Sequence, residues 1–174
     1  MDMNDLMKMM LNSGVAEQVS EKAGVSAQDA VEIMQDVLPM LLKGMQGQAT
    51  NKATQEGFLK ALSDHSKDDT SDINKAIKNV DTEDGAKIVN HLLGAQQEEL
   101  AAKAKAKKKG IDTKKILKIM AILAPILMSK MGSATAKQSA KSSKSSSNDM
   151  VDIVSGLLDG VDAGDVIKIV SKLI

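Results

Sequence analysis

Two stretches of sequence decide the fold: GVSAQDAVEIMQDVLPMLLKGM, residues 24–45, and GIDTKKILKIMAILAPILMSKM, residues 110–131. They contain the chain's two prolines, Pro39 and Pro125, which lie 86 positions apart. When the stretches are aligned at that offset without gaps, six of 22 positions are identical and seven others exchange one apolar residue for another. The sequence therefore predicts an internal structural repeat.

Each stretch is predicted to contain a turn glycine, a capped helix, a proline and a second apolar helical segment. Gly24 aligns with Gly110 in the turn, and Ser26 aligns with Asp112 as the helix N-cap. Because proline lacks the backbone N–H, we expect it to kink the helix or to start a new one. Two such units would bury their apolar faces together around a pseudo-twofold axis. We therefore predict an all-α multi-helix bundle of two pseudo-equivalent Pro-kinked units plus a C-terminal helix pair.

The polar faces of the two units differ in charge. The first unit has polar or acidic residues where the second has lysines, namely Gln28, Asp29 and Glu32 against Lys114, Lys115 and Lys118. One interpretation is complementary docking, either within one chain or between chains. The other is two separate solvated faces, since exposed ion pairs contribute only about 0–1 kcal/mol each.

The composition favours helices and excludes several kinds of site. The chain has 12 methionines and one aromatic residue, Phe58, so its core must be built from aliphatic and thioether side chains. The absence of cysteine excludes disulfides, thiolate nucleophiles and Cys-ligated metals. The longest uncharged apolar run, residues 119–128, is about half the roughly 20 residues that a membrane span needs. We expect a cytoplasmic protein without a transmembrane segment.

Apolar residues recur at helical spacing in further segments of a helical domain that spans residues 1–132. The additional predicted helices cover residues 2–12, 15–23, 54–63, 72–80 and 87–109. Between them, residues 64–69 are predicted to form a loop and residues 81–85 a turn.

The C-terminal part is predicted to be a tethered tail. Residues 133–149 hold seven serines, three lysines and little to bury, which predicts a flexible linker. Residues 150–174 are expected to form two short amphipathic helices, with apolar residues that include Leu157, Leu158, Ile169 and Leu173. A segment this short cannot hold a core alone, so it must dock on the domain, on another copy or on a partner. We expect self-association through this tail.

One basic block lies between acidic regions, although the formal net charge is zero. Residues 101–150 contain 12 lysines and two acids. The lysines of interest are Lys103, Lys105, Lys107, Lys108, Lys109, Lys114, Lys115 and Lys118. Weak, non-specific binding of nucleic acid or an anionic surface is the alternative function that they suggest. The chain lacks arginine for guanine contacts and this stretch lacks aromatics for stacking, so a solvated helix is preferred and nucleic-acid binding is not expected.

The two histidines are the candidates for acid–base catalysis. His65 lies beside Asp64 and near Asp68 and Asp69, and a His–Asp pair can transfer protons. We prefer a structural interpretation, in which Asp64 caps or ends a helix and His65 lies at its C-terminal end. His91 is expected to be half-buried and hydrogen-bonded. Two histidines make a poor metal site, and we predict no enzymatic activity, no cofactor and no metal.

Four segments, in this order, resemble the YidB-like bacterial family of unknown function; they are residues 24–45, TQEGFLKALSDH (54–65), EDGAKIVNHLLG (83–94) and residues 110–132. The resemblance covers about residues 14–132. It implies an all-helical, cytoplasmic, non-enzymatic bacterial protein, and it implies no specific activity. Some members end in an Asp/Gly-rich segment like a calcium loop. The counterpart here, residues 159–165, lacks several of the oxygen ligands of an EF-hand loop, so we expect a turn there.

Overall fold

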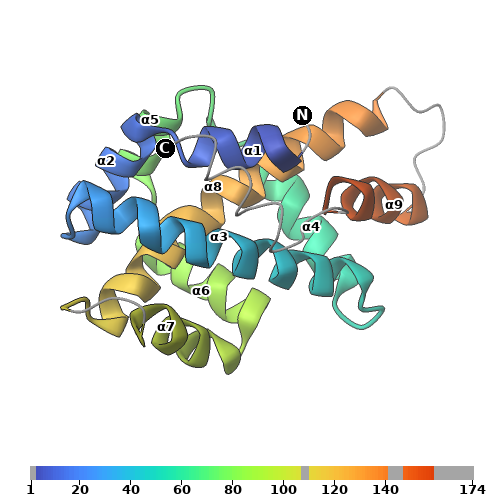
Figure 1. The fold of residues 1–174 in the computed structure, drawn as a ribbon. Helices are drawn as coiled ribbons and strands as arrows, with labels where there is room; N and C mark the ends of the chain where they lie inside the picture. Colours follow the sequence, from blue (N-terminus) through green and yellow to red (C-terminus); the bar gives the residue numbers. More distant parts are fainter. Residues whose placement is uncertain (1–2, 107–109, 141–146, 159–174) are drawn as a thin grey trace.

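A computed structural model shows the chain as a bundle of α-helices, and it describes residues 3–106, 110–140 and 147–158 (Figure 1). In chain order, the helices are α1 (Met3–Met10), α2 (Ser13–Ala23), α3 (Ala27–Thr50), α4 (Gln55–His65), α5 (Ile73–Asn79), α6 (Thr82–Leu93), α7 (Gln96–Ala106), α8 (Thr113–Ser139) and α9 (Ser147–Leu158). No strand occurs within the described residues. The prediction of an all-α multi-helix bundle is confirmed.

The two long helices, α3 and α8, begin in the same way. Each follows a glycine with left-handed backbone conformation, Gly24 at φ 73° and Gly110 at φ 87°. A residue with a side chain rarely adopts this conformation, which explains the glycine at both turns. The side chains of Ser26 and Asp112 each accept a hydrogen bond from an amide in the first turn of the following helix. The N-caps predicted from the aligned stretches are therefore present.

Both prolines lie inside helices that continue past them, so neither Pro39 nor Pro125 starts a new helix. The missing N–H of Pro125 leaves the carbonyl of Ala121, four residues earlier, without its helical partner. The backbone of α6 lies against this carbonyl at Gly85, and a Cβ added there would overlap the carbonyl oxygen. The absence of a side chain at Gly85 therefore allows α6 and α8 to approach this closely.

The contacts between helices follow the predicted repeat. Helix α4 packs against α8, and α9 packs against α3; likewise α2 contacts α8, and α7 contacts α3. Exchanging the units (α2 with α7, α3 with α8, α4 with α9) reproduces these pairs, as a pseudo-twofold relation requires. Figure 1 shows α3 crossing the molecule with α8 behind it. Helix α5, which packs against α2 and α8, has no counterpart in the second unit.

The apolar core contains the aligned residues of both units. The buried pairs at equivalent positions are Ile33 and Ile119, Met34 and Met120, Leu41 and Leu127, and Met45 and Met131. The one aromatic side chain, Phe58, is also buried. The core is thus made of aliphatic and methionine side chains, as the composition predicts.

Three predicted boundaries differ from the structure. Gly85 lies within α6, so the turn predicted at residues 81–85 is reduced to the N-cap residue, Asp81. The helix predicted over residues 87–109 is interrupted at Gly94, whose φ of 55° ends α6 before α7 begins. Helix α4 extends to His65, so the following loop starts later than expected.

The tail also differs from its prediction. Helix α8 continues to Ser139, so residues 133–139 are helical, and the side chain of Thr135 is buried. Helix α9 starts at Ser147 and packs against α3, α4 and α8 of its own chain. The remaining linker residues, 141–146, and residues 159–174, which include Ile169, Leu173 and the Asp/Gly-rich segment, lie outside the described residues.

Among the described residues, α8 is the one helix long and apolar enough to cross a membrane by length and composition. Within its most apolar 18-residue window, 78% of the residues are buried inside the bundle. The same composition is found in the core helices of helical bundles, and α8 holds that position here.

Gly85→Ala is expected to lower the free energy of unfolding by at least about 2 kcal/mol, because the new methyl group must push α6 away from α8. Gly57→Ala is the matched control. Gly57 lies in α4, and an added Cβ there meets no atom within 4 Å. Helix propensity should raise the stability of this control by up to about 1 kcal/mol. Urea denaturation measures both values, and equal effects would contradict the close approach of α6 to α8.

Candidate functional site

The loop that joins α4 to α5 lies against α8 and lines two hollows of about 500 and 510 Å³. Asp68, Asp69 and Thr70 contribute to both. We call the first the lysine hollow; it is lined by Asp68, Asp69, Thr70, Ser71, Lys130, Ser133, Ala134, Lys137 and Gln138. We call the second the acidic hollow; it is lined by His65, Asp68, Asp69, Thr70, Lys75, Ala76, Asn79, Val80, Asp81, Asp84, Pro125, Ile126 and Ser129.

Hydroxyl groups hold this loop on α8. The hydroxyls of Thr70 and Ser129 are 3.1 Å apart, and both residues are buried. Ser129 also donates to the carbonyl of Asp68 at 3.3 Å, and Ser133 donates to the carbonyl of Ser66 at 3.2 Å. Buried hydroxyls need such partners, because an unpaired one costs about 1–3 kcal/mol. The loop is therefore fixed at the points where it borders the hollows.

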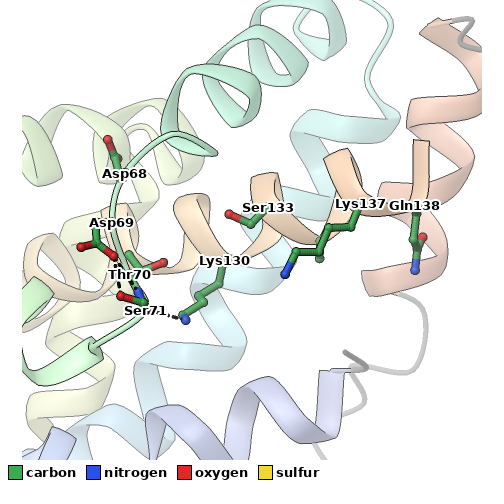
Figure 2. A pocket seen from close by; sticks show the side chains of 9 residues that line it. Asp68, Asp69, Thr70, Ser71, Lys130, Ser133, Lys137 and Gln138 are labelled. Carbon is green, nitrogen blue, oxygen red and sulfur yellow. Dashed lines mark hydrogen bonds between the residues drawn. The ribbon is translucent and has the colours of Figure 1, made fainter. Parts of the chain in front are cut away.

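Two lysines of α8 form one wall of the lysine hollow. Lys130 is half-buried, and its Nζ donates to the carbonyl of Thr70 at 2.5 Å. Figure 2 shows Lys137, seven residues later on the same face of α8, extending towards the same loop. Burial lowers the pKa of Lys130, and the positive charge of Lys137 lowers it further, while Asp69 acts in the opposite direction. The positive charges of the two lysines therefore repel each other.

The two carboxylates of the loop are engaged locally. Asp69 accepts from the hydroxyl of Ser71 at 2.6 Å and from its amide at 3.1 Å. These two hydrogen bonds hold the pKa of Asp69 below its ordinary value, and the bond from the hydroxyl has the larger effect. Asp68 Oδ2 lies 2.7 Å from His65 Nδ1. Figure 2 shows both carboxylates pointing away from Lys130 and Lys137.

The acidic hollow gathers carboxylates without building a metal site. Asp81 is the N-cap of α6 and accepts from the amides of Glu83 and Asp84 at 2.8 and 3.3 Å. In the part of the chain that the structure describes, no group of three or more His, Cys, Asp or Glu side chains is placed to hold a metal ion. Asp81 therefore caps a helix, Asp69 accepts hydrogen bonds within its own turn, and Asp68 pairs with His65.

The two histidines lie in different surroundings. His65 ends α4 as expected, but its partner is Asp68 and not the adjacent Asp64. His91 is exposed, so the prediction of a half-buried ring is wrong, although its Nδ1 lies 3.2 Å from the carbonyl of Lys87. His91 lines neither hollow. The geometry therefore offers one histidine–carboxylate pair, on the acidic hollow.

The basic stretch does not form one continuous free surface. Lys103 makes an ion pair with Glu99 at 2.8 Å, and the Nζ of Lys115 donates to the carbonyl of Gly24 at 2.9 Å. The second bond joins the two units, and it places a cation at the C-terminal end of α2, where the helix dipole favours it. Lys103 and Lys115 are exposed despite these bonds, and so are Lys105, Lys114 and Lys118. Lys107, Lys108 and Lys109 lie outside the described residues.

The predicted apolar tail residues are only partly placed. Leu157 and Leu158 belong to the last turn of α9. The described α9 residues that pack on the core are Val151, which is half-buried, and Val154, which is fully buried. Sequence reasoning did not single out either valine, nor the lysine hollow. Lys130, Ser133 and Lys137 recur at i, i+3 and i+7, a helical stripe that is visible only if α8 is extended beyond residue 132.

Residues 5–134 match a family described as bacterial protein of unknown function, DUF937. The chain belongs to this family. The matched region runs from α1 into the second half of α8. It includes all of α3, the loop between α4 and α5 that borders both hollows, and Lys130. The expected membership of a bacterial family of unknown function is thereby confirmed for this DUF937 protein. No curated protein and no solved structure matches the chain.

Ser71→Ala should raise the pKa of Asp69 towards its ordinary value, because the variant loses the hydroxyl donor that lowers it most. Ser133→Ala is the matched control, since Ser133 bonds to the carbonyl of Ser66 and not to Asp69. The measurement is an NMR titration of the side-chain carboxyl carbons. An Asp69 titration that is identical in the wild type and in Ser71→Ala would contradict the described geometry.

Proposed function

We propose that this DUF937 protein is a non-enzymatic interaction protein that self-associates by exchanging α9 between two copies. The observation that supports the exchange is the seat of α9, which lies against α3, α4 and α8 and so against both units of the repeat. We also propose, from the four sequence segments named above, that the protein belongs with the YidB-like members of the family.

A binding role is supported by how the polar groups are used. Catalytic groups are typically held in a cleft with pKa values displaced by burial and by a charged partner. In the acidic hollow, by contrast, Asp81 caps a helix and Asp69 accepts bonds within its own turn. The side chain of Asp68, which pairs with His65, is 54% exposed to solvent. These arrangements stabilise the fold and leave no assembled acid–base pair sheltered from water.

The exchange follows from how α9 is attached. Val154 is fully buried in the seat, and residues 140–146 connect α8 to α9 along the chain. A connection of this length reaches at most about 25 Å when extended. Every copy carries both the helix and the seat, so reciprocal exchange gives a symmetric dimer with two identical contacts. Because the contacts equal those of the monomer, the length of the connection and the protein concentration set the balance.

The full chain should therefore show a dimer fraction that rises with protein concentration in size-exclusion chromatography with light scattering. Val154→Asp should abolish the dimer, because a carboxylate in the apolar seat prevents α9 from docking in either chain. Gly156→Asp is the matched control, since Gly156 is exposed and an added Cβ meets no atom within 4 Å.

Deleting residues 142–145 sharpens the test. The shortened connection reaches only about 10 Å, which should prevent α9 from folding back and should drive exchange. Inserting four Gly or Ser residues at the same place should instead favour the monomer. A monomeric mass for the wild type and for the deletion variant at all concentrations would refute the exchange.

A further inference from the structure

We propose that the lysine hollow binds a small anionic molecule through its phosphate or carboxylate group, held between Lys130 and Lys137. The site lies on α8 and the α4–α5 loop, and it does not depend on self-association through α9. The ligand class follows from which hydrogen-bonding groups of the hollow are already used and which remain.

Several acceptors that border the hollow are already engaged within the protein. Asp69 accepts twice from Ser71, the carbonyl of Thr70 accepts from Lys130, and the carbonyl of Asp68 accepts from Ser129. The hydroxyl of Ser71 likewise donates its hydrogen bond to Asp69. The described donors of this loop are thus directed to its own acceptors, and its two carboxylates point away from Lys130 and Lys137 (Figure 2).

Donors, by contrast, remain. A lysine ammonium group carries three N–H donors, and the described bond of Lys130 to Thr70 uses one of them. The described residues form ion pairs between His65 and Asp68 and between Lys103 and Glu99, and neither Lys130 nor Lys137 takes part. A wall with spare charged donors favours a ligand that brings negatively charged acceptors.

The geometry prepares the two ammonium groups for one ligand. The bond to Thr70 fixes Lys130 Nζ, and the loop that supplies this carbonyl is itself anchored by the Thr70–Ser129 pair. Lys137 follows two helical turns later, at about 10 Å along the axis, so its flexible side chain can reach the same group. The hollow of about 500 Å³ is larger than a phosphate ion. It has room for the remainder of a small metabolite.

The electrostatics agree with this assignment. Burial and the charge of Lys137 disfavour the charged form of Lys130, which lowers its pKa. An anion between the two ammonium groups would replace this repulsion by attraction and would raise the pKa again. Binding should therefore weaken as the pH rises through the lowered pKa of Lys130, where the ammonium of the free protein loses its proton.

The test is a titration of the full-length, ¹⁵N-labelled protein with inorganic phosphate and, separately, with acetate at constant ionic strength. We expect saturable shifts of the amide signals of Thr70, Ser71 and residues 130–138. Tighter binding of phosphate would assign a phosphorylated ligand, and tighter binding of acetate would assign a carboxylate.

Lys137→Gln removes one ammonium group at an exposed position, so the fold should be retained, and the dissociation constant should rise at least tenfold. Lys114→Gln is the matched control, because it removes an exposed lysine from the first turn of the same helix. Its dissociation constant should equal that of the wild type. Lys130→Met should abolish binding while the thermal transition of the variant shows that it is folded.

Three results would overturn the proposal. The first is the absence of saturable shifts with both anions. The second is shifts spread over the exposed lysines of the whole chain. The third is an equal affinity in Lys137→Gln and Lys114→Gln, because a general charge effect would then account for the binding.

Discussion

The close approach of α6 to α8 at Gly85 is the constraint on which the rest of the arrangement depends. Pro125 leaves a carbonyl of α8 without its helical donor, and the glycine lets a second helix lie directly against it. At its other end, α6 meets α3 where a Cβ added to Gly44 would be 3.1 Å from the carbonyl of Leu92. A single short helix is thus fixed against both long helices, and it holds the two units of the repeat in place.

The same contact positions the acidic hollow, and a second close contact on α8 lies near the lysine hollow. The N-terminal end of α6, with Asp81 and Asp84, borders the acidic hollow beside Pro125. Further along α8, a Cβ added to Gly132 would overlap the carbonyl of Leu62, so α4 also lies tightly against this helix. Helix α8 therefore serves two purposes. One face fills the core, and a polar stripe on its second half holds the α4–α5 loop and presents Lys130 and Lys137.

Sequence reasoning succeeded where the signal is local. The turn glycines Gly24 and Gly110 and the Ser26 and Asp112 caps are requirements of the backbone at single positions, so the pattern of residues reveals them. It failed where tertiary contacts decide. Residues 133–139 have a linker-like composition, yet Thr135 is buried in the bundle and its hydroxyl is satisfied by the carbonyl of Met131, so tertiary packing extends α8 through them. Because of that error, Lys137 and the lysine hollow were not predicted. The spacing of Lys130, Ser133 and Lys137 places them on one face only if the segment is helical.

The crossed packing of the repeat has a consequence for how the chain can be divided. Helix α4 lies on α8, and α9 lies on α3, so each half of the protein supplies part of the cover for the other half's long helix. A backbone cut between α5 and α6 would leave two pieces with exposed, mutually complementary apolar faces. Such pieces have the properties of a split protein, whose fragments regain their shape when they recombine.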